Sequence, residues 1–305
     1  MRIDLHVHSS MSDGTDRPDE LPSRARSAGL DVFALTDHDT FEGWASATAA
    51  AAEAGVVVVP GVEISTRLFG SGVHLLGYLP DPAHAPLADE LARVRDSRAR
   101  RLSEMTRLLT EAGMPLDVSD VLSAAGPAST LGRPHVADAM VAKGYIGDRA
   151  EAFAHWLYEG GPAYVPRYAL ATPEAIRLVR AAGGVSVLAH PWGRGSRRVL
   201  DADAITALVA DGLTGIEIDH EDHNADDRAA LREIAGSLGL VVTGSSDHHG
   251  TGKAGHALGI NTTEPAEYER LLERGRQAAA AAGREFPGSV WRDMARAEQA
   301  AEREL

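Results

Sequence analysis

The chain contains no cysteine. Disulfides and thiolate chemistry are therefore excluded, and any bound metal must be held by histidine and carboxylate side chains. The chain also lacks a targeting segment and an apolar run long enough to span a bilayer, which predicts a cytoplasmic protein without a membrane partner. Positive charge is scarce as well, with 30 Lys and Arg against 44 Asp and Glu. The net charge of −14 argues against long duplex nucleic acid but allows a small phosphorylated substrate, because bound metals reverse the local field.

What the chain does have is a regular alternation of strands and helices. Short apolar runs bounded by turn residues predict seven buried strands. These predicted strands cover residues 3–8, 32–35, 56–59, 73–79, 185–189, 215–218 and 241–243. Seven strands separated by helices predict an α/β fold, a closed and mainly parallel barrel.

The alternation is interrupted in the middle of the chain. Residues 81–161 show helical periodicity and no convincing strand, so we predict a helical insertion that caps the substrate site. It includes a long Arg-rich helix at residues 87–111. The barrel would then comprise residues 1–80 and 162–263, and residues 264–305 would form a C-terminal helical extension.

Histidines and carboxylates follow the predicted strands at the ends where barrels of this kind carry their catalytic groups. His6 and His8 share a face because residues two apart in a strand point the same way. Six of the seven strands bring such a residue to this rim. The candidate metal ligands are His6, His8, Asp13, His38, Glu63, His74, His190, Asp247 and His249. Nine ligands are too many for one ion, so they predict two or three ions of zinc, manganese or iron, with Glu63 as a bridge.

These residues resemble the motifs of the PHP family, named after polymerase and histidinol phosphatase. The matching segments are Asp4-Leu5-His6-Val7-His8, Ser12-Asp13-Gly14, Thr36-Asp37-His38, Gly61-Val62-Glu63, His74, Leu188-Ala189-His190-Pro191 and Ser246-Asp247-His248-His249. The resemblance implies a distorted barrel of seven strands with a trinuclear metal centre, and it implies three ligand sets. These sets are His6, His8, Glu63 and Asp247; Glu63, His74 and His190; and Asp13, His38 and His249. His248 would point elsewhere.

Within that family, the helical insertion resembles the small phosphoesterases of the TrpH/YciV type. The resemblance lies in the segments Leu131-Gly132-Arg133-Pro134-His135 and Gly160-Gly161-Pro162-Ala163-Tyr164-Val165-Pro166. It implies hydrolysis of nucleotides, including 3′,5′-bisphosphates such as pAp, and AMP, or of the 5′ ends of short RNA oligonucleotides. A metal-bound hydroxide would be the nucleophile.

A few other residues are candidates for contacts with a substrate. Arg133 precedes a predicted helix start at Pro134, where phosphate binds readily, so Arg133 and His135 are predicted to bind substrate phosphate. His223 is a candidate acid for the leaving oxygen. The alternatives are that Arg133 belongs to a surface capping sequence and that His223 lies in a solvated acidic loop. The arginines between residues 93 and 107 are expected on a solvated helix face.

Other functions also fit these observations. The chain could be a phosphatase for histidinol phosphate or another small metabolite, or a metal-binding scaffold without activity, like the PHP domains of some polymerases. The intact ligand set argues against the scaffold. A barrel amidohydrolase usually has a modified Lys at a strand end, and none of the predicted strand ends has a Lys.

Overall fold

In the computed structural model, which describes residues 1–286, the strands form a nearly closed barrel. The strand order is β1-β2-β3-β4-β6-β7-β8, and a bridge between Val7 and His248 brings the first and last strands together. The strands are β1 (Ile3–Val7), β2 (Val32–Leu35), β3 (Val57–Leu68), β4 (Ser71–Tyr78), β6 (Val185–Leu188), β7 (Gly215–Asp219) and β8 (Val241–Gly244), and the two-residue β5 (Leu170–Ala171) pairs with β3. The predicted fold class, a distorted seven-strand α/β barrel, is confirmed.

The distortion of the barrel comes from β4, which runs antiparallel to both of its neighbours. The strand predicted at residues 56–59 is much longer, because β3 pairs in parallel with β2 and then continues to Leu68 as one arm of a hairpin. The turn of this hairpin lies at Phe69 and Gly70, which both have positive φ. Glu63 consequently lies within β3, and His74 lies in the first half of β4 rather than at a strand end.

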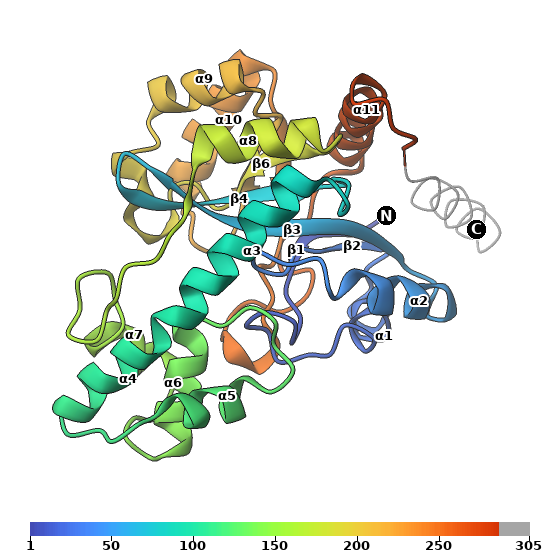
Figure 1. Cartoon of the computed structure of the whole chain (residues 1–305). Coiled ribbons are helices and arrows are strands. Elements are labelled where there is room, and N and C mark those ends of the chain that lie inside the picture. The colour runs from blue at the N-terminus through green and yellow to red at the C-terminus, as the bar shows by residue number, and fades with distance from the viewer. Residues whose placement is uncertain (287–305) are drawn as a thin grey trace.

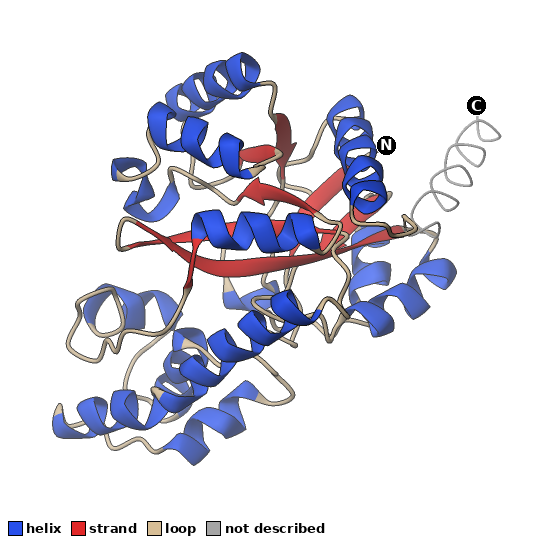
Figure 2. Cartoon of the chain, turned by 45° about the horizontal axis from the view of Figure 1, so that its top comes forward, coloured by secondary structure: helices blue, strands red, loops and turns tan. Residues whose placement is uncertain are grey.

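Helices cover the outside of the barrel, as Figures 1 and 2 show. Every residue of β1, β2 and β6 is buried, which explains why these strands are continuous apolar runs interrupted mainly by the site residues. The outer helices are α1 (Leu21–Ser27), α2 (Trp44–Ala54), α8 (Thr172–Ala181), α9 (Ala202–Asp211), α10 (Ala225–Leu238) and α11 (Pro265–Ala281). Two short 3₁₀ turns, η1 (Gly193–Arg198) and η2 (Gly250–Gly252), follow β6 and β8. The predicted C-terminal extension lies outside the described residues from position 287 onward.

The segment between β4 and β5 is helical, and its helices α4 to α7 lie to one side of the strands (Figure 2). These helices are α3 (Ala85–Arg100), α4 (Leu102–Glu111), α5 (Val118–Ala125), α6 (Arg133–Ala142) and α7 (Arg149–His155). The single helix predicted at residues 87–111 is wrong, since the chain leaves the helix at Arg101. The reason is a change of packing partner: Leu91 of α3 packs with the barrel, whereas Leu102 of α4 packs with the other insertion helices. The domain limits at residues 81 and 161 stay a prediction.

Within the described part of the chain, none of the helices has both the length and the apolarity that crossing a bilayer requires.

Candidate metal centre

Glu63 lies at the centre of a buried set of imidazoles. Its Oε1 lies 2.7 Å from Nδ1 of His74 and 3.2 Å from Nε2 of His190. Its Oε2 lies 3.1 Å from Nε2 of His8 and 3.1 Å from Nδ1 of His38. Nδ1 of His74 forms no hydrogen bond in this arrangement, despite its short distance to the carboxylate. Two oxygens that each face several ring nitrogens suit a carboxylate that bridges cations.

The donor atoms form three overlapping groups, two of which include Glu63. In each group, the nearest donor atoms all lie within 4.8 Å of one another. The groups are His6, His8, Glu63 and Asp247; His38, Glu63 and His74; and His8, Asp13, His38 and His249. The first group is identical to one of the ligand sets that the resemblance implies. The third group is another of these sets with His8 added. In the second, His38 stands where the resemblance implied His190, although His190 also contacts Glu63.

The hydrogen bonds of the first-strand histidines show that their facing nitrogens suit a metal ion. Nδ1 of His6 donates to Glu217 at 3.1 Å, which leaves Nε2 as the nitrogen that offers a lone pair when the ring is neutral. The hydroxyl of Ser12 donates to Asp37 at 2.6 Å and is left to accept from Nδ1 of His8 at 3.4 Å. The two Nε2 atoms lie 3.0 Å apart. Lone pairs at this distance repel each other unless a proton or a cation lies between them, so the donor set fits a divalent metal.

Burial and mutual charge shift the pKa values of the cluster strongly. Burial disfavours the charged form of His8, but hydrogen bonds with Asp247 and Glu63 outweigh this effect and raise its pKa to about 9. Burial lowers the pKa of His38 to about 3. Burial alone would raise the pKa of Glu63, yet the surrounding imidazoles, His38 first, hold it well below its ordinary value. The Glu63 carboxylate therefore stays ionised, and a metal would compete with protons at His8.

Glu217 is a rim residue in β7, the one strand for which no metal ligand was predicted. This carboxylate is fully buried, and besides His6 it accepts a hydrogen bond from the backbone N–H of His190 at 2.7 Å. It thus orients residues from β1 and from the segment after β6. Its signal in the sequence is a lone acid within the apolar strand Gly215-Ile216-Glu217-Ile218.

Asp247 divides its two oxygens between the cluster and a lysine. Oδ1 lies 3.4 Å from Nε2 of both His6 and His8, and Oδ2 lies 2.5 Å from Nζ of Lys253. Burial alone would raise the pKa of Asp247, but Lys253 and the nearby imidazoles hold it well below its usual range. The backbone φ of Asp247 is 51°, a left-handed conformation that non-glycine residues adopt at a cost and that often marks functional sites. No sequence motif indicated a role for Lys253.

A fourth group of ligand-type side chains, His220, Asp247 and His256, lies beside Lys253. Nδ1 of His220 accepts the backbone N–H of Asp222 at 3.0 Å. Its Nε2 therefore carries the hydrogen and points it at Asp247, 3.4 Å away. With a ring N–H and an ammonium already directed at the carboxylate, this group is a poor metal site.

Two predicted substrate residues, His135 and His223, have both ring nitrogens engaged by the backbone. In His135, Nδ1 accepts from the N–H of Gly132 and Nε2 donates to the carbonyl of Ser12. His223 donates to a carbonyl at 2.8 Å and accepts the N–H of Trp192 at 3.2 Å. Both rings connect loops beside the rim in this arrangement, and their roles as phosphate ligand and acid stay predictions.

Two neighbours of the predicted ligands also have local partners. His248 lies 2.9 Å from Asp16 and so points away from the Glu63 cluster. Asp37 accepts from the backbone and the hydroxyl of Ser9 as well as from Ser12. It reaches the imidazole of His8 through Ser12 rather than directly.

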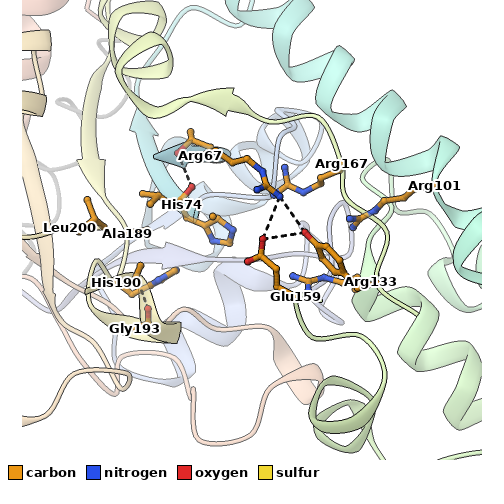
Figure 3. A pocket seen from close by; sticks show the side chains of 15 residues that line it. Arg67, His74, Arg101, Arg133, Glu159, Arg167, Ala189, His190, Gly193 and Leu200 are labelled. Atoms are coloured by element: carbon orange, nitrogen blue, oxygen red, sulfur yellow. Dashed lines mark hydrogen bonds and ion pairs between the residues drawn. The ribbon is translucent and has the colours of Figure 1, made fainter. Parts of the chain in front are cut away.

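A pocket of about 260 Å³ opens beside the cluster, where His74 and His190 form part of its wall (Figure 3). Four arginines line it: Arg67, Arg101, Arg133 and Arg167. Of these, the sequence pointed to Arg133, whose Nη1 donates to the carbonyl of Leu157 at 2.8 Å. The other three were missed because β3, α3–α4 and the segment before β5 bring them together only in the folded chain.

The arginines of this pocket are crowded. Burial, followed by repulsion from Arg98, Arg167 and Arg133, lowers the pKa of Arg101 to about 8. Burial and Arg98 lower the pKa of Arg167 to about 9. Nε of Arg101 is buried and has no hydrogen-bond partner among residues 1–286. Crowded guanidinium groups, with Nε of Arg101 available as a donor, suit an anion such as phosphate.

The predicted solvated face at residues 93–107 is wrong for two of its arginines. Arg98 and Arg101 are both buried. Arg98 pairs with the fully buried Asp39 at 2.9 Å, and Arg101 donates to the carbonyl of Val165 at 3.0 Å. These charged side chains are buried because each has partners of its own in the folded chain.

A barrel rim of histidines and carboxylates beside an arginine pocket defines a metal-dependent hydrolase for anionic substrates. Residues 4–111 match the PHP domain. The chain is 34% identical to the 3′,5′-nucleoside bisphosphate phosphatase of Chromobacterium violaceum, over 84% of this chain and 90% of that protein. It is also 34% identical to a 5′-3′ exoribonuclease of Haemophilus influenzae, over 81% of this chain and 90% of that one.

The fold comparison agrees. The crystal structure of a candidate metal-dependent phosphoesterase from Bifidobacterium adolescentis superposes with a TM-score of 0.86 at 37% identity, covering 90% of this chain and 96% of that chain. The chain belongs to the PHP family, as its motifs predicted, and it is a phosphoesterase.

Proposed function

We propose that this phosphoesterase acts on nucleotides, with 3′,5′-bisphosphates such as pAp as preferred substrates, and with AMP and the 5′ ends of short RNA oligonucleotides in the same class. One observation carries the proposal: His74 and His190 contact Glu63 and also line the arginine pocket. A phosphate at the cluster would place a second phosphate of the same small molecule among the arginines. The activities named for the relatives from Chromobacterium violaceum and Haemophilus influenzae support this substrate class.

The proposed metal centre holds two or three divalent ions of manganese, iron or zinc. Such ions supply a hydroxide nucleophile at neutral pH and offset the negative charge of the phosphate. Glu217 fixes the ring of His6, the Ser12 hydroxyl fixes that of His8, and Lys253 holds one oxygen of Asp247. The proposed ligands are His6, His8, Asp13, His38, Glu63, His74, His190, Asp247 and His249.

The test is phosphate release by metal-reconstituted protein from pAp, AMP, histidinol phosphate and a 5′-phosphorylated RNA oligomer. The proposal expects the highest kcat/KM for pAp or the RNA oligomer, because both offer phosphates to the cluster and to the arginines. A clear preference for histidinol phosphate would favour a phosphatase of small metabolites instead. Release from none of the four would contradict the proposal altogether.

A further inference from the structure

Glu159 places a carboxylate in the arginine pocket. Among the described residues that line this pocket, it is the one acid. Its Oε1 lies 3.5 Å from Nη2 of Arg67 and accepts from the hydroxyl of Tyr164 at 3.4 Å. Arg67 in turn donates to that hydroxyl at 3.2 Å. Figure 3 shows Glu159 and Arg67 on the same side of the pocket, joined by a dashed line. The carboxylate of Glu159 thus uses donors that an anionic ligand of the pocket would need.

Two glycines follow Glu159, and both are needed for the backbone conformation of the turn in which Glu159 lies. Gly160 has a φ of 85°, in the left-handed region that favours glycine. At Gly161, an added Cβ would come within 2.7 Å of the carbonyl oxygen of Trp156. The turn therefore holds Glu159 at the pocket by a defined backbone conformation.

The contacts of Glu159 are weak enough to be exchanged. Its side chain is 51% exposed and that of Arg67 is 30% exposed, so solvent screens their attraction. A terminal phosphate carries up to about two negative charges and three acceptor oxygens, whereas a carboxylate has one charge and two oxygens. The phosphate is the stronger partner for crowded guanidinium groups.

We propose that Glu159 is a built-in occupant of the anion pocket, which the second phosphate of a substrate must displace. This inference rests on the proposed function. Displacement lowers the apparent affinity for every ligand that uses the arginines, because only the fraction of protein with a vacated pocket binds it. Substrates with a single phosphate at the metal cluster do not incur this cost. Glu159 thereby sets how strongly the enzyme prefers bisphosphates over monophosphates.

A purely supporting role for Glu159 predicts the opposite sign. If the carboxylate served to orient Arg67 for the substrate, its removal would weaken binding of bisphosphates. The direction of the change in KM therefore separates the two roles.

The experiment compares Glu159→Gln with the wild-type protein, both metal-loaded, by steady-state kinetics. We expect KM for pAp to fall by about two- to fivefold, the range that corresponds to an exposed ion pair. KM for adenosine 3′-monophosphate and for AMP should change less. The matched control is Glu111→Gln, which removes an exposed carboxylate paired with Arg107 on α4 and should leave all KM values unchanged.

A rise in KM for pAp, or an equal fall for bisphosphate and monophosphates, would overturn the inference. Calorimetric binding of pAp to both proteins makes the same comparison without turnover, and there Glu159→Gln should bind more tightly. Failure of the proposed function shows differently, because wild-type protein would then release phosphate from none of the substrates.

Discussion

Nζ of Lys253 lies 2.5 Å from Oδ2 of Asp247, while Oδ1 of the same carboxylate faces the histidines of β1. The ammonium thus neutralises part of the charge that Asp247 offers to the proposed metal centre. In Lys253→Ala, the full carboxylate charge would face the cluster. We expect tighter binding of divalent metal, on the order of tenfold, because a neighbouring positive charge is lost.

Competition with a fluorescent chelator measures this change in metal affinity. The matched control is Lys143→Ala, which removes an exposed lysine paired with Asp120 in the insertion. Weaker metal binding by Lys253→Ala would show instead that Lys253 is needed to orient Asp247.

Arg101 and Arg133 should contribute to binding of a second phosphate. Charge-assisted hydrogen bonds contribute about 1.5–3 kcal/mol, so Arg101→Met and Arg133→Ala should each raise KM for pAp by roughly ten- to a hundredfold. KM for AMP should rise less. Arg93→Ala is the control, since Arg93 is exposed and packs over the Tyr168 ring outside the pocket. An unchanged KM for pAp in both pocket variants would refute the assignment of the pocket.

The hydrogen bonds of His223 predict that this residue stabilises the fold. His223→Ala leaves the carbonyl of Ile218 and the N–H of Trp192 without their present partner. Losing such buried partners costs about 1–3 kcal/mol each, and urea unfolding should show a decrease of that order. The acidic and basic limbs of the pH–rate profile should persist. Loss of the basic limb, with stability retained, would establish His223 as the proton donor instead.

The metal-free protein should lose stability as the pH rises from 6.5 to 9. Because the folded-state pKa of His8 is raised to about 9 from an ordinary value of 6.5, its protonation stabilises the fold fully below pH 6.5. This stabilisation is lost as the pH passes through 9. His6, whose pKa lies well above its ordinary value, acts in the same direction.

Metal binding should show the reverse dependence on pH, because a metal requires the neutral imidazole. Urea unfolding of chelator-treated protein at pH 6.5 and pH 9 gives the first measurement, and metal titration over the same range gives the second. A metal-free stability that increases toward pH 9 would contradict the account of His8.

Much of the barrel follows from local sequence patterns. The strands are short apolar runs between turn residues, and His6 and His8 share a face because of the two-residue repeat of a strand. Candidate ligands that closely follow strands, such as His38 and His190, could be placed at the rim by topology alone. The antiparallel direction of β4 could not be predicted, because it depends on the hairpin that β4 forms with β3. The length of β3 could not be predicted either, since its second half is a strand through pairing with β4 rather than through its own composition.

Residues that act through distant partners were not predictable. The sequence around Arg101 predicts a solvated basic helix face. In the structure Arg101 lies at the break between α3 and α4, where it is buried near Arg167. Lys253 lies in a polar loop whose neighbouring residues Thr251 and Gly252 contact Thr15 and Arg149, both far away in the sequence. Glu159 lies in a glycine-containing turn, and its relation to Arg67 exists because the insertion returns to the hairpin of β3 and β4.

The most direct test of the central claim is phosphate release from pAp by wild-type protein and by Glu63→Gln, each measured with and without added divalent metal. Glu63 contacts His8, His38, His74 and His190, so its exchange for a neutral amide should remove most of the bound metal. The account predicts metal-dependent turnover by the wild-type protein and loss of both metal and turnover in the variant. Undiminished turnover by Glu63→Gln, or turnover by wild-type protein that withstands metal removal, would contradict it.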